Sequence, residues 1–241
     1  MKTFLTAVII NFLVFSQEIA QAQAPLELSS SLWRGIGGKT KWDSTNYILF
    51  SVTGNDSEFL QNGRKFLINK RSGQVRFEGK TESGNNIVAL FNFKTEKLSK
   101  LFSNGEERPV STEVNTVFTR INEQFKKDAA FIFLPALIDA PDTRTGKVSS
   151  KIVNAEKLLS VSFQLKDNSL SGELLFNGET GYIKQIIDKE GNEYFVNGYK
   201  DIGGGLVLPT VFKSMDGSEK SATFPTAAAF TDMEESKFSN L

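Results

Sequence analysis

The feature that most constrains the fold of this chain is a regular series of turn signals, in which Gly, Asn and Asp separate short apolar or alternating segments. Turn signals spaced by roughly 8–12 residues are typical of antiparallel strands that follow one another in the sheet. In the first half, strands are expected at residues 47–53, 65–69, 74–79, 87–93 and 97–103. In the second half, they are expected at residues 148–155, 158–165, 172–176, 182–188, 193–199, 206–214 and 222–231.

One segment between the two series of strands breaks this pattern and predicts a helix over residues 112–127. Its apolar residues recur at spacings of three and four, which is helical periodicity: Val114, Val117, Phe118, Ile121 and Phe125. Ser111 is the expected N-cap, Glu113 lies in the first turn, and Lys126 and Lys127 are expected in the last turn, all favourable for the helix dipole. The apolar face is expected to lie on the concave side of the sheet.

Two further segments complete the expected architecture. Residues 131–138 form an apolar, buried segment that bends at Pro135, and residues 23–41 form an irregular or partly helical lead-in with Leu32 and Trp33 as anchors. No linker and no internal repeat divides the chain, so residues 23–241 are expected to be a single domain. The predicted class is α+β and β-rich: an incomplete antiparallel β-barrel, or half-barrel, covered on its concave side by one long helix and the short apolar segment.

The amino-terminal segment has the layout of a secretory signal peptide. Lys2 supplies a positive n-region, residues 4–15 an apolar h-region, and Ala20-Gln21-Ala22 a small-x-small cleavage site. The h-region is shorter than the roughly 20 apolar residues that a membrane-spanning helix needs. We therefore expect residues 1–22 to be removed and the mature protein to be periplasmic or secreted.

The composition excludes several classes of function. The sequence has no Cys and no His, which removes disulfides, lipid attachment at Cys, most nucleophile–base pairs and most transition-metal sites. Its 28 basic and 28 acidic residues cancel, so there is no broad electrostatic reason to bind nucleic acid. No segment after the signal peptide suggests stable membrane insertion. We expect no cofactor, no metal and no catalytic residues.

Two glycine-rich segments resemble nucleotide-binding motifs but lack their context. Residues 35–40 end in GKT, yet Trp33 stands where a phosphate loop requires Gly, and no strand precedes the segment. Residues 203–205 are three glycines between two expected strands, where a dinucleotide-binding motif requires a following helix. The second segment therefore predicts a tight turn with positive φ.

The positive signal in the sequence is aromatic, because the chain has 21 Phe against four Tyr and two Trp. One interpretation is a Phe-rich core; the other is an apolar cavity that the helix fills only in part. The Phe side chain has no hydrogen-bonding group, so a surface lined by Phe suits acyl chains better than sugars. The candidate ligand-binding residues are Phe77, Phe91, Phe93, Phe118, Phe163 and Phe176.

Three short motifs resemble those of a known family. They are Gly37-Gly38 followed by Trp42, Phe133-Leu134-Pro135 after the helix, and residues 199–209, a Tyr, acid, Gly, Leu, Pro hairpin. With this order of elements, the chain is similar to secreted members of the LolA-like superfamily of periplasmic lipoprotein-carrier folds. The resemblance spans nearly all of residues 32–231. It implies an open antiparallel barrel with an apolar cavity, which shelters lipid acyl chains in the carriers.

These observations predict an exported, soluble, non-enzymatic protein that binds an apolar small molecule, a lipid or the acyl chain of a lipoprotein. An envelope scaffold, or a module that binds an envelope protein and has a filled core, is the first alternative. The second is a carboxylate-dependent hydrolase that would use loop acids such as Asp139, Asp142 and Asp201.

The export prediction is tested at the amino terminus of the protein recovered after secretion. Cleavage after Ala22 should leave Gln23 as the first residue, because Ala20 and Ala22 provide the small residues of the cleavage site. Intact-mass analysis with amino-terminal sequencing should report this species. Recovery of a chain that still carries Met1 would contradict the assignment.

Overall fold

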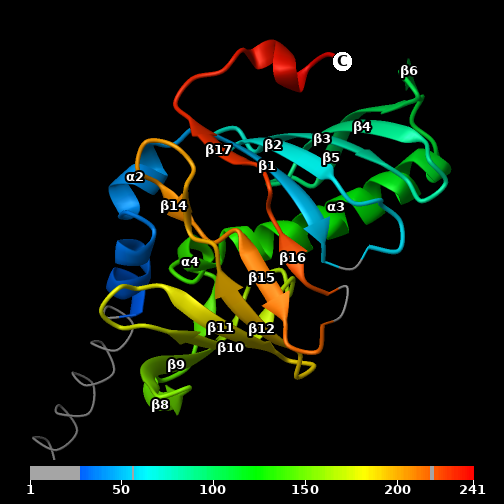
Figure 1. Cartoon of the computed structure of the whole chain (residues 1–241). Helices are drawn as coiled ribbons and strands as arrows, with labels where there is room; N and C mark the ends of the chain where they lie inside the picture. Colours follow the sequence, from blue (N-terminus) through cyan, green and yellow to red (C-terminus); the bar gives the residue numbers. More distant parts are fainter. Residues whose placement is uncertain (1–27, 56, 218–219) are drawn as a thin grey trace, which may run out of the picture.

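The computed structural model describes residues 28–241 apart from residues 56 and 218–219 (Figure 1). The expected signal peptide, residues 1–22, lies outside the described residues. In the described part of the chain, fifteen strands form one antiparallel sheet, ordered β6-β5-β4-β3-β2-β1-β16-β15-β12-β11-β10-β9-β7, with β17 beside β1 and β8 beside β9. The two ends of this sheet do not pair with each other, so the sheet is an open half-barrel.

The first half of the sheet is a meander in sequence order. Its strands are β1 (Tyr47–Gly54), β2 (Arg64–Asn69), β3 (Gln74–Lys80), β4 (Asn86–Asn92), β5 (Lys97–Ser103) and β6 (Glu106–Glu107). The five strands expected between residues 47 and 103 are confirmed to within one residue at each end. The register places Phe50 beside Phe66 and Phe66 beside Phe77, so these rings share the concave face.

The second half follows the long helix and returns to the first. Its strands are β7 (Arg144–Thr145), β8 (Ser149–Val153), β9 (Glu156–Gln164), β10 (Ser171–Phe176), β11 (Ile183–Asp188), β12 (Glu193–Asn197), β15 (Val211–Ser214), β16 (Ala222–Thr223) and β17 (Ala227–Phe230). Strand β16 pairs with both β15 and β1, and β17 also pairs with β1. The last strands therefore join the two halves into one curved sheet (Figure 1).

Two of the expected strands are broken in two. Within residues 206–214, β14 (Val207–Leu208) pairs with β13 (Lys200–Asp201) in a separate small sheet, and β15 starts only after Pro209. Within residues 222–231, Pro225 separates β16 from β17. Proline has no N–H to donate to a ladder, which explains both interruptions.

The long helix α3 (Thr112–Ile132) begins where the sequence predicts and ends later. The Ser111 hydroxyl accepts a hydrogen bond from the Val114 N–H at 3.2 Å, which confirms the N-cap. Ala129 and Ala130 are strong helix formers and carry the helix five residues beyond Lys127. The placement of Lys126 and Lys127 in the last turn was therefore wrong.

The apolar segment 131–138 is divided between two helices at Phe133, so the expected bend at Pro135 lies two residues too late. Phe131 and Ile132 close α3, and a second helix, α4 (Leu134–Leu137), has Pro135 in its first turn, where a missing N–H is tolerated. Residues 131–134 are all buried, as expected. The segment covers the concave side of the sheet together with α3 (Figure 1).

The lead-in brings the three motif segments together. Residues 28–35 are helical, Leu32 and Trp33 are buried as expected, and α2 (Lys39–Ser44) carries Trp42. The Trp42 ring meets the Phe133 ring edge-on at 5.5 Å. A Cβ on Gly37, where φ is 89°, would collide with the carbonyl oxygen of Gly205. The motifs thus form one structural contact at this end of the half-barrel.

The carboxyl-terminal residues pack on the outer face of the sheet. The 3-10 helix η1 (Glu235–Phe238) stacks Phe238 on Tyr47 with ring centroids 6.0 Å apart, and the Arg76 guanidinium donates to the Asn240 carbonyl at 2.5 Å. Within residues 28–241, leaving aside residues 56 and 218–219, none of the helices is both long and apolar enough to cross a membrane.

The position of α3 yields a stability prediction. Phe118 is 8 % exposed and its ring packs against Phe91 at 5.5 Å, so Phe118→Asp would bury an unpaired charge. We expect a loss of at least the ~3–5 kcal/mol that truncating a buried Phe costs, measured by urea unfolding. Thr119→Asp, at the next and exposed position, should change stability by about 0.5 kcal/mol or less. If the two variants were equally stable, Phe118 would not be buried against the sheet, and the inner face assigned to α3 would be wrong.

Candidate functional site

The space between α3 and the concave face of the sheet is filled by a continuous series of aromatic rings. Neighbouring ring centroids are 5.0–5.9 Å apart along the order Tyr194, Phe131, Phe212, Phe224, Phe50, Phe66, Phe125, Phe91 and Phe118. These separations are those of favourable edge-to-face and tilted pairs. We call this series the ring network. It runs through both halves of the sheet and packs the interior.

The structure brings four of the six candidate residues together. Phe91, Phe93 and Phe118 lie at one end of the ring network, where Phe91 and Phe93 both contact the ring of Phe125. Phe77 joins them through Phe66, at 5.2 Å. Phe93 is half-buried and the other three are buried. These four side chains could line a single apolar site under α3.

The other two candidates lie elsewhere in the sheet. Phe163 on β9 and Phe176 on β10 are buried in the second half, and among the described ring contacts neither touches the other four. The candidate residues leave out seven members of the ring network, of which Phe125 and Phe131 were expected only as buried core residues: Phe50, Phe66, Phe125, Phe131, Tyr194, Phe212 and Phe224. The alternation of Ile48, Phe50 and Val52 in β1 is a signal that could have identified the first of them.

A buried ion pair joins the sheet to the helix inside this apolar interior. Arg64, at the start of β2, and Asp128 on α3 both have side chains that are 0 % exposed. The guanidinium donates two hydrogen bonds to the carboxylate, from Nε to Oδ2 at 2.6 Å and from Nη2 to Oδ1 at 2.7 Å. Nη2 also donates to the carbonyl of Gly54 at 2.8 Å. This bidentate geometry is the strong form of an Arg–carboxylate contact.

Two amide side chains complete this cluster, which we call the polar anchor (Arg64, Asp128, Asn55 and Gln124). Asn55 Nδ2 and Gln124 Nε2 donate to Asp128 Oδ1 at 2.7 and 3.0 Å. Burial raises the pKa of the Asp128 carboxyl, while Arg64 and the two amides act in the opposite direction. Nη1 of Arg64 is also buried, and it has no hydrogen-bond partner in the described part of the chain.

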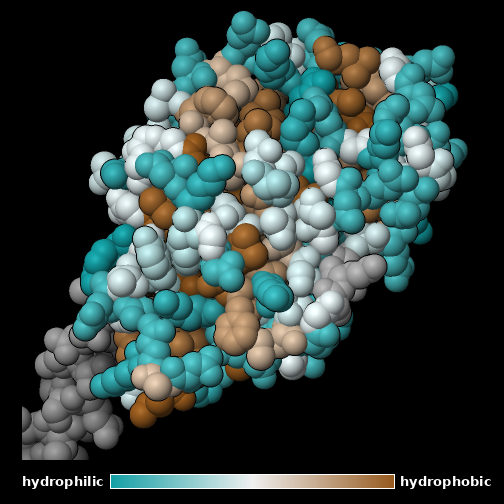
Figure 2. Space-filling view, in the orientation of Figure 1, coloured by the Kyte–Doolittle hydropathy of each residue, from teal (hydrophilic) through white to brown (hydrophobic). Residues whose placement is uncertain are grey.

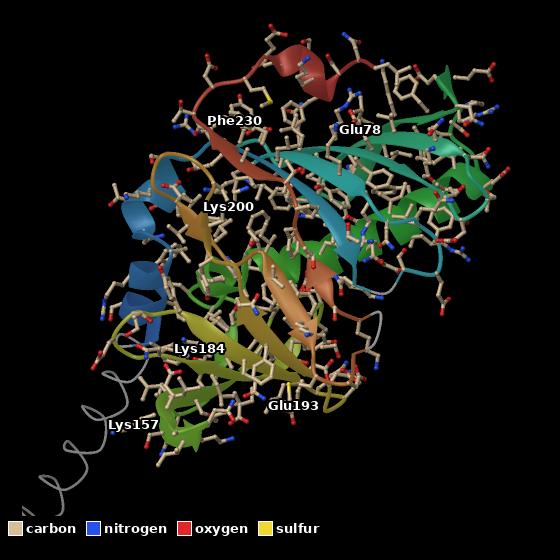
Figure 3. All side chains as sticks on the ribbon, in the orientation of Figure 1. Glu78, Lys157, Lys184, Glu193, Lys200 and Phe230 are labelled. Atoms are coloured by element: carbon tan, nitrogen blue, oxygen red, sulfur yellow. The ribbon has the colours of Figure 1, made fainter. Side chains whose placement is uncertain are left out.

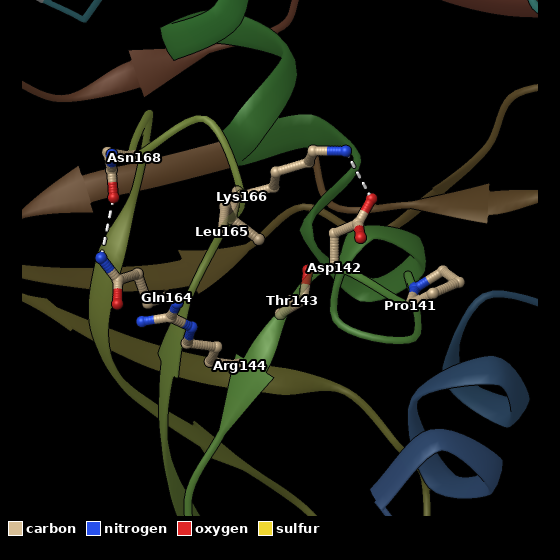
Figure 4. A pocket seen from close by; sticks show the side chains of 8 residues that line it. All are labelled: Pro141, Asp142, Thr143, Arg144, Gln164, Leu165, Lys166 and Asn168. Atoms are coloured by element: carbon tan, nitrogen blue, oxygen red, sulfur yellow. Dashed lines mark hydrogen bonds and ion pairs between the residues drawn. The ribbon is translucent and has the colours of Figure 1, made fainter.

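The loop acids named for a hydrolase each have a separate local role. Asp139 accepts from the Trp33 indole N–H at 2.9 Å, and Asp201 accepts from the Gly203 N–H at 2.8 Å. Asp142 pairs with Lys166 at 2.7 Å at the edge of a surface pocket of about 530 Å³ (Figure 4). That pocket is lined by a single acid, whereas glycosidase chemistry uses two facing carboxylates. The described residues also hold no group of three or more acids that could bind a metal ion.

Comparisons with known proteins found several solved structures with a related fold, among them two of low sequence identity. One is a domain from Vibrio parahaemolyticus described as an outer membrane lipoprotein-sorting protein, with 7 % identity and a TM-score of 0.43 over 83 % of this chain and 93 % of that one. The other is a DUF1329 family protein from Desulfovibrio piger, with 11 % identity and a TM-score of 0.44 over 90 % and 96 %. No protein family and no curated protein sequence matches the chain.

The polar anchor predicts a characteristic pattern of mutational effects. Asp128→Asn leaves the Arg64 charge buried without its counter-charge, and such a loss costs about 3–5 kcal/mol. Replacing both partners by apolar residues, as Arg64→Met with Asp128→Leu, should cost much less, because no uncompensated charge remains buried. Denaturant unfolding of the three proteins measures both effects.

A surface pair provides the control for this experiment. Lys126 binds Glu96 at 2.8 Å in a far more exposed setting, so Lys126→Met should cost about 0–1 kcal/mol. If Asp128→Asn were as stable as the native protein, the pair would not fasten α3 to the sheet.

Proposed function

We propose that the chain is an exported, non-enzymatic protein that binds the apolar chain of a lipid or of a lipidated protein between α3 and the concave face of the sheet. The observation that carries this proposal is the ring network, which lies between one helix and a sheet that is open at both ends. A helix that covers an apolar sheet face can separate from it to admit an apolar chain, because the exposed rings then contact the ligand in place of water.

The distribution of apolar surface supports an internal site over an external one. On the face shown in Figure 2, apolar atoms lie in small areas between hydrophilic ones. The large apolar residues that are exposed are scattered over separate elements: Val110, Ile152, Met215, Phe230 and Leu241. Glu78 and Glu193 mark the charged outer face of the two halves of the sheet (Figure 3). An apolar ligand therefore finds its largest matching surface inside the half-barrel.

A second candidate function is favoured by the packing of the interior. Ring centroids 5.0–5.9 Å apart describe a full core, and a protein with a full core serves as an envelope scaffold or binds a protein partner through its polar surface. The two functions differ in whether the folded protein takes up an apolar molecule at all.

Titration with saturated fatty acids of increasing length distinguishes them. Each methylene that leaves water contributes about 0.8 kcal/mol, so affinity should rise about fourfold for each added carbon until the interior is full. Displacement of a hydrophobic fluorophore reports the affinities. A folded protein that takes up no fatty acid of any length would eliminate the lipid-binding proposal and leave the scaffold.

A pair of matched substitutions tests where the chain lies. Phe93→Glu places a charge at the half-buried end of the ring network, beside Phe125, and should weaken binding at least about tenfold, because the ligand would have to desolvate a carboxylate. Phe230→Glu makes the same change at a position on β17 that is 38 % exposed, and should leave binding unchanged. Equal effects of the two substitutions would show that the site is not under α3.

A further inference from the structure

A second pocket opens where the ring network reaches the surface at Tyr194. It has a volume of about 320 Å³ and lies between α3, the turn that joins β9 to β10 and the turn that joins β11 to β12. Its apolar wall consists of Phe131, Leu170 and Tyr194, and the rings of Phe131 and Tyr194 are 5.2 Å apart. An apolar chain in contact with these rings would continue directly into the interior.

The remaining lining of this pocket is polar and carries an excess of positive charge. Lys127, Lys189 and Lys220 face two acids, Asp188 and Glu190. Glu190 pairs with Lys189 at 3.6 Å. Three ammonium groups against two carboxylates leave the pocket lining with an excess of one positive charge, and Asp216 acts on the Tyr194 phenol from outside the lining.

The second acid is also occupied within the protein. Asp188 accepts two hydrogen bonds from Asn192, from its backbone N–H at 2.8 Å and from its Nδ2 at 2.7 Å. The Tyr194 hydroxyl donates to Asp188 Oδ2 at 3.5 Å, and burial, together with Asp188, Asp216 and Glu190, raises the pKa of the phenol, which therefore stays protonated.

Lys127 is the cation best placed to meet a ligand. It is exposed on α3 and makes no ion pair and no side-chain hydrogen bond among the described residues. It lies on the turn of α3 that also carries Asp128 of the polar anchor, and Asn55 of the same anchor lines the pocket. Ser171 adds a hydroxyl group to the lining, whereas the Ser169 hydroxyl already donates to Asp167 at 2.6 Å.

We propose that this pocket binds the anionic headgroup, a phosphate or a carboxylate, of an amphiphile whose apolar chain lies along the ring network. This inference rests on the proposed function and names its ligand class: anionic single-chain or double-chain amphiphiles in preference to neutral ones. Lys127 supplies the cation, and the Ser171 hydroxyl supplies a neutral donor to the headgroup oxygens. The ring network supplies the apolar contact.

Calorimetric titration with three ligands of equal chain length and with one free ion tests the inference. The ligands are decyl phosphate and decanoate, each below its micellar concentration, and decanol, below its solubility limit; the ion is inorganic phosphate. Both anionic amphiphiles should bind about tenfold or more tightly than decanol, the gain of one charge-assisted hydrogen bond. Their affinity should fall as salt is added, while that of decanol should not. Inorganic phosphate should bind far more weakly than decyl phosphate.

Lys127→Met and Lys126→Met provide a matched pair on neighbouring positions of α3. Both remove one positive charge, but only Lys127 lines the pocket. We expect Lys127→Met to lose most of the preference for anionic over neutral ligands with decanol binding unchanged, and Lys126→Met to retain it. Far-UV circular dichroism and unfolding curves confirm that both variants are folded.

The outcomes separate this inference from the proposed function. Decanol binding as strong as that of decyl phosphate would overturn the headgroup site and leave the apolar site standing. Inorganic phosphate binding as strong as that of decyl phosphate would show a free-anion site unrelated to lipid. If Lys127→Met kept the preference for anionic over neutral ligands, Lys127 would not be part of the headgroup site. Failure of all three amphiphiles to bind would overturn the proposed function and the headgroup assignment with it.

Discussion

The contact between α3 and the concave face of an open sheet is the constraint on which the rest of this structure depends. A sheet that does not close on itself exposes its inner face to water unless another element covers that face. Here the cover is α3, which contributes Phe118, Phe125 and Phe131 to the ring network. Apolar contacts of this kind are strong but not directional. The buried pair of Arg64 and Asp128 adds direction, because two charges with 0 % exposed side chains require each other as partners in one geometry.

The two halves of α3 are fastened in different ways, and this bears on how an apolar chain could enter. The buried hydrogen bonds that α3 makes to the strands and their adjoining loop come from Gln124 and Asp128, in its carboxyl-terminal half. In the amino-terminal half, Val114, Phe118 and Ile121 are buried by apolar contact. When the amino-terminal half of α3 separates from the sheet, an apolar ligand can replace the apolar contacts that are lost. An apolar ligand cannot replace the ion pair between Arg64 and Asp128. The amino-terminal half of α3 therefore separates from the sheet to accommodate the far end of an apolar chain, while the polar anchor, beside the headgroup pocket, stays fixed.

Local patterns in the sequence predicted local structure well, and tertiary contacts explain most of what they missed. Ser111 and the apolar spacing located the start and inner face of α3, because capping and periodicity act within a few residues. The expected end of α3 at Lys127 is wrong because lysines also occur inside helices, and the apolar face continues through Phe131. The partnership of Arg64 with Asp128 joins residues 64 positions apart, and no local pattern specifies it. One signal was available: Asp128 lies three positions after Phe125, on the apolar face of the helix, where a charge requires a buried partner.

Distance measurement between α3 and the sheet tests the central claim most directly, and the absence of cysteine from the sequence makes it practical. Thr119 on α3 and Gln74 on β3 are both exposed and can be replaced by Cys for spin labelling. Double electron–electron resonance should give one narrow distance distribution without ligand, and a shift to longer distances when a fatty acid or decyl phosphate saturates the protein. A distribution that stays unchanged while the ligand is bound would show that α3 does not part from the sheet, and would contradict binding beneath the helix.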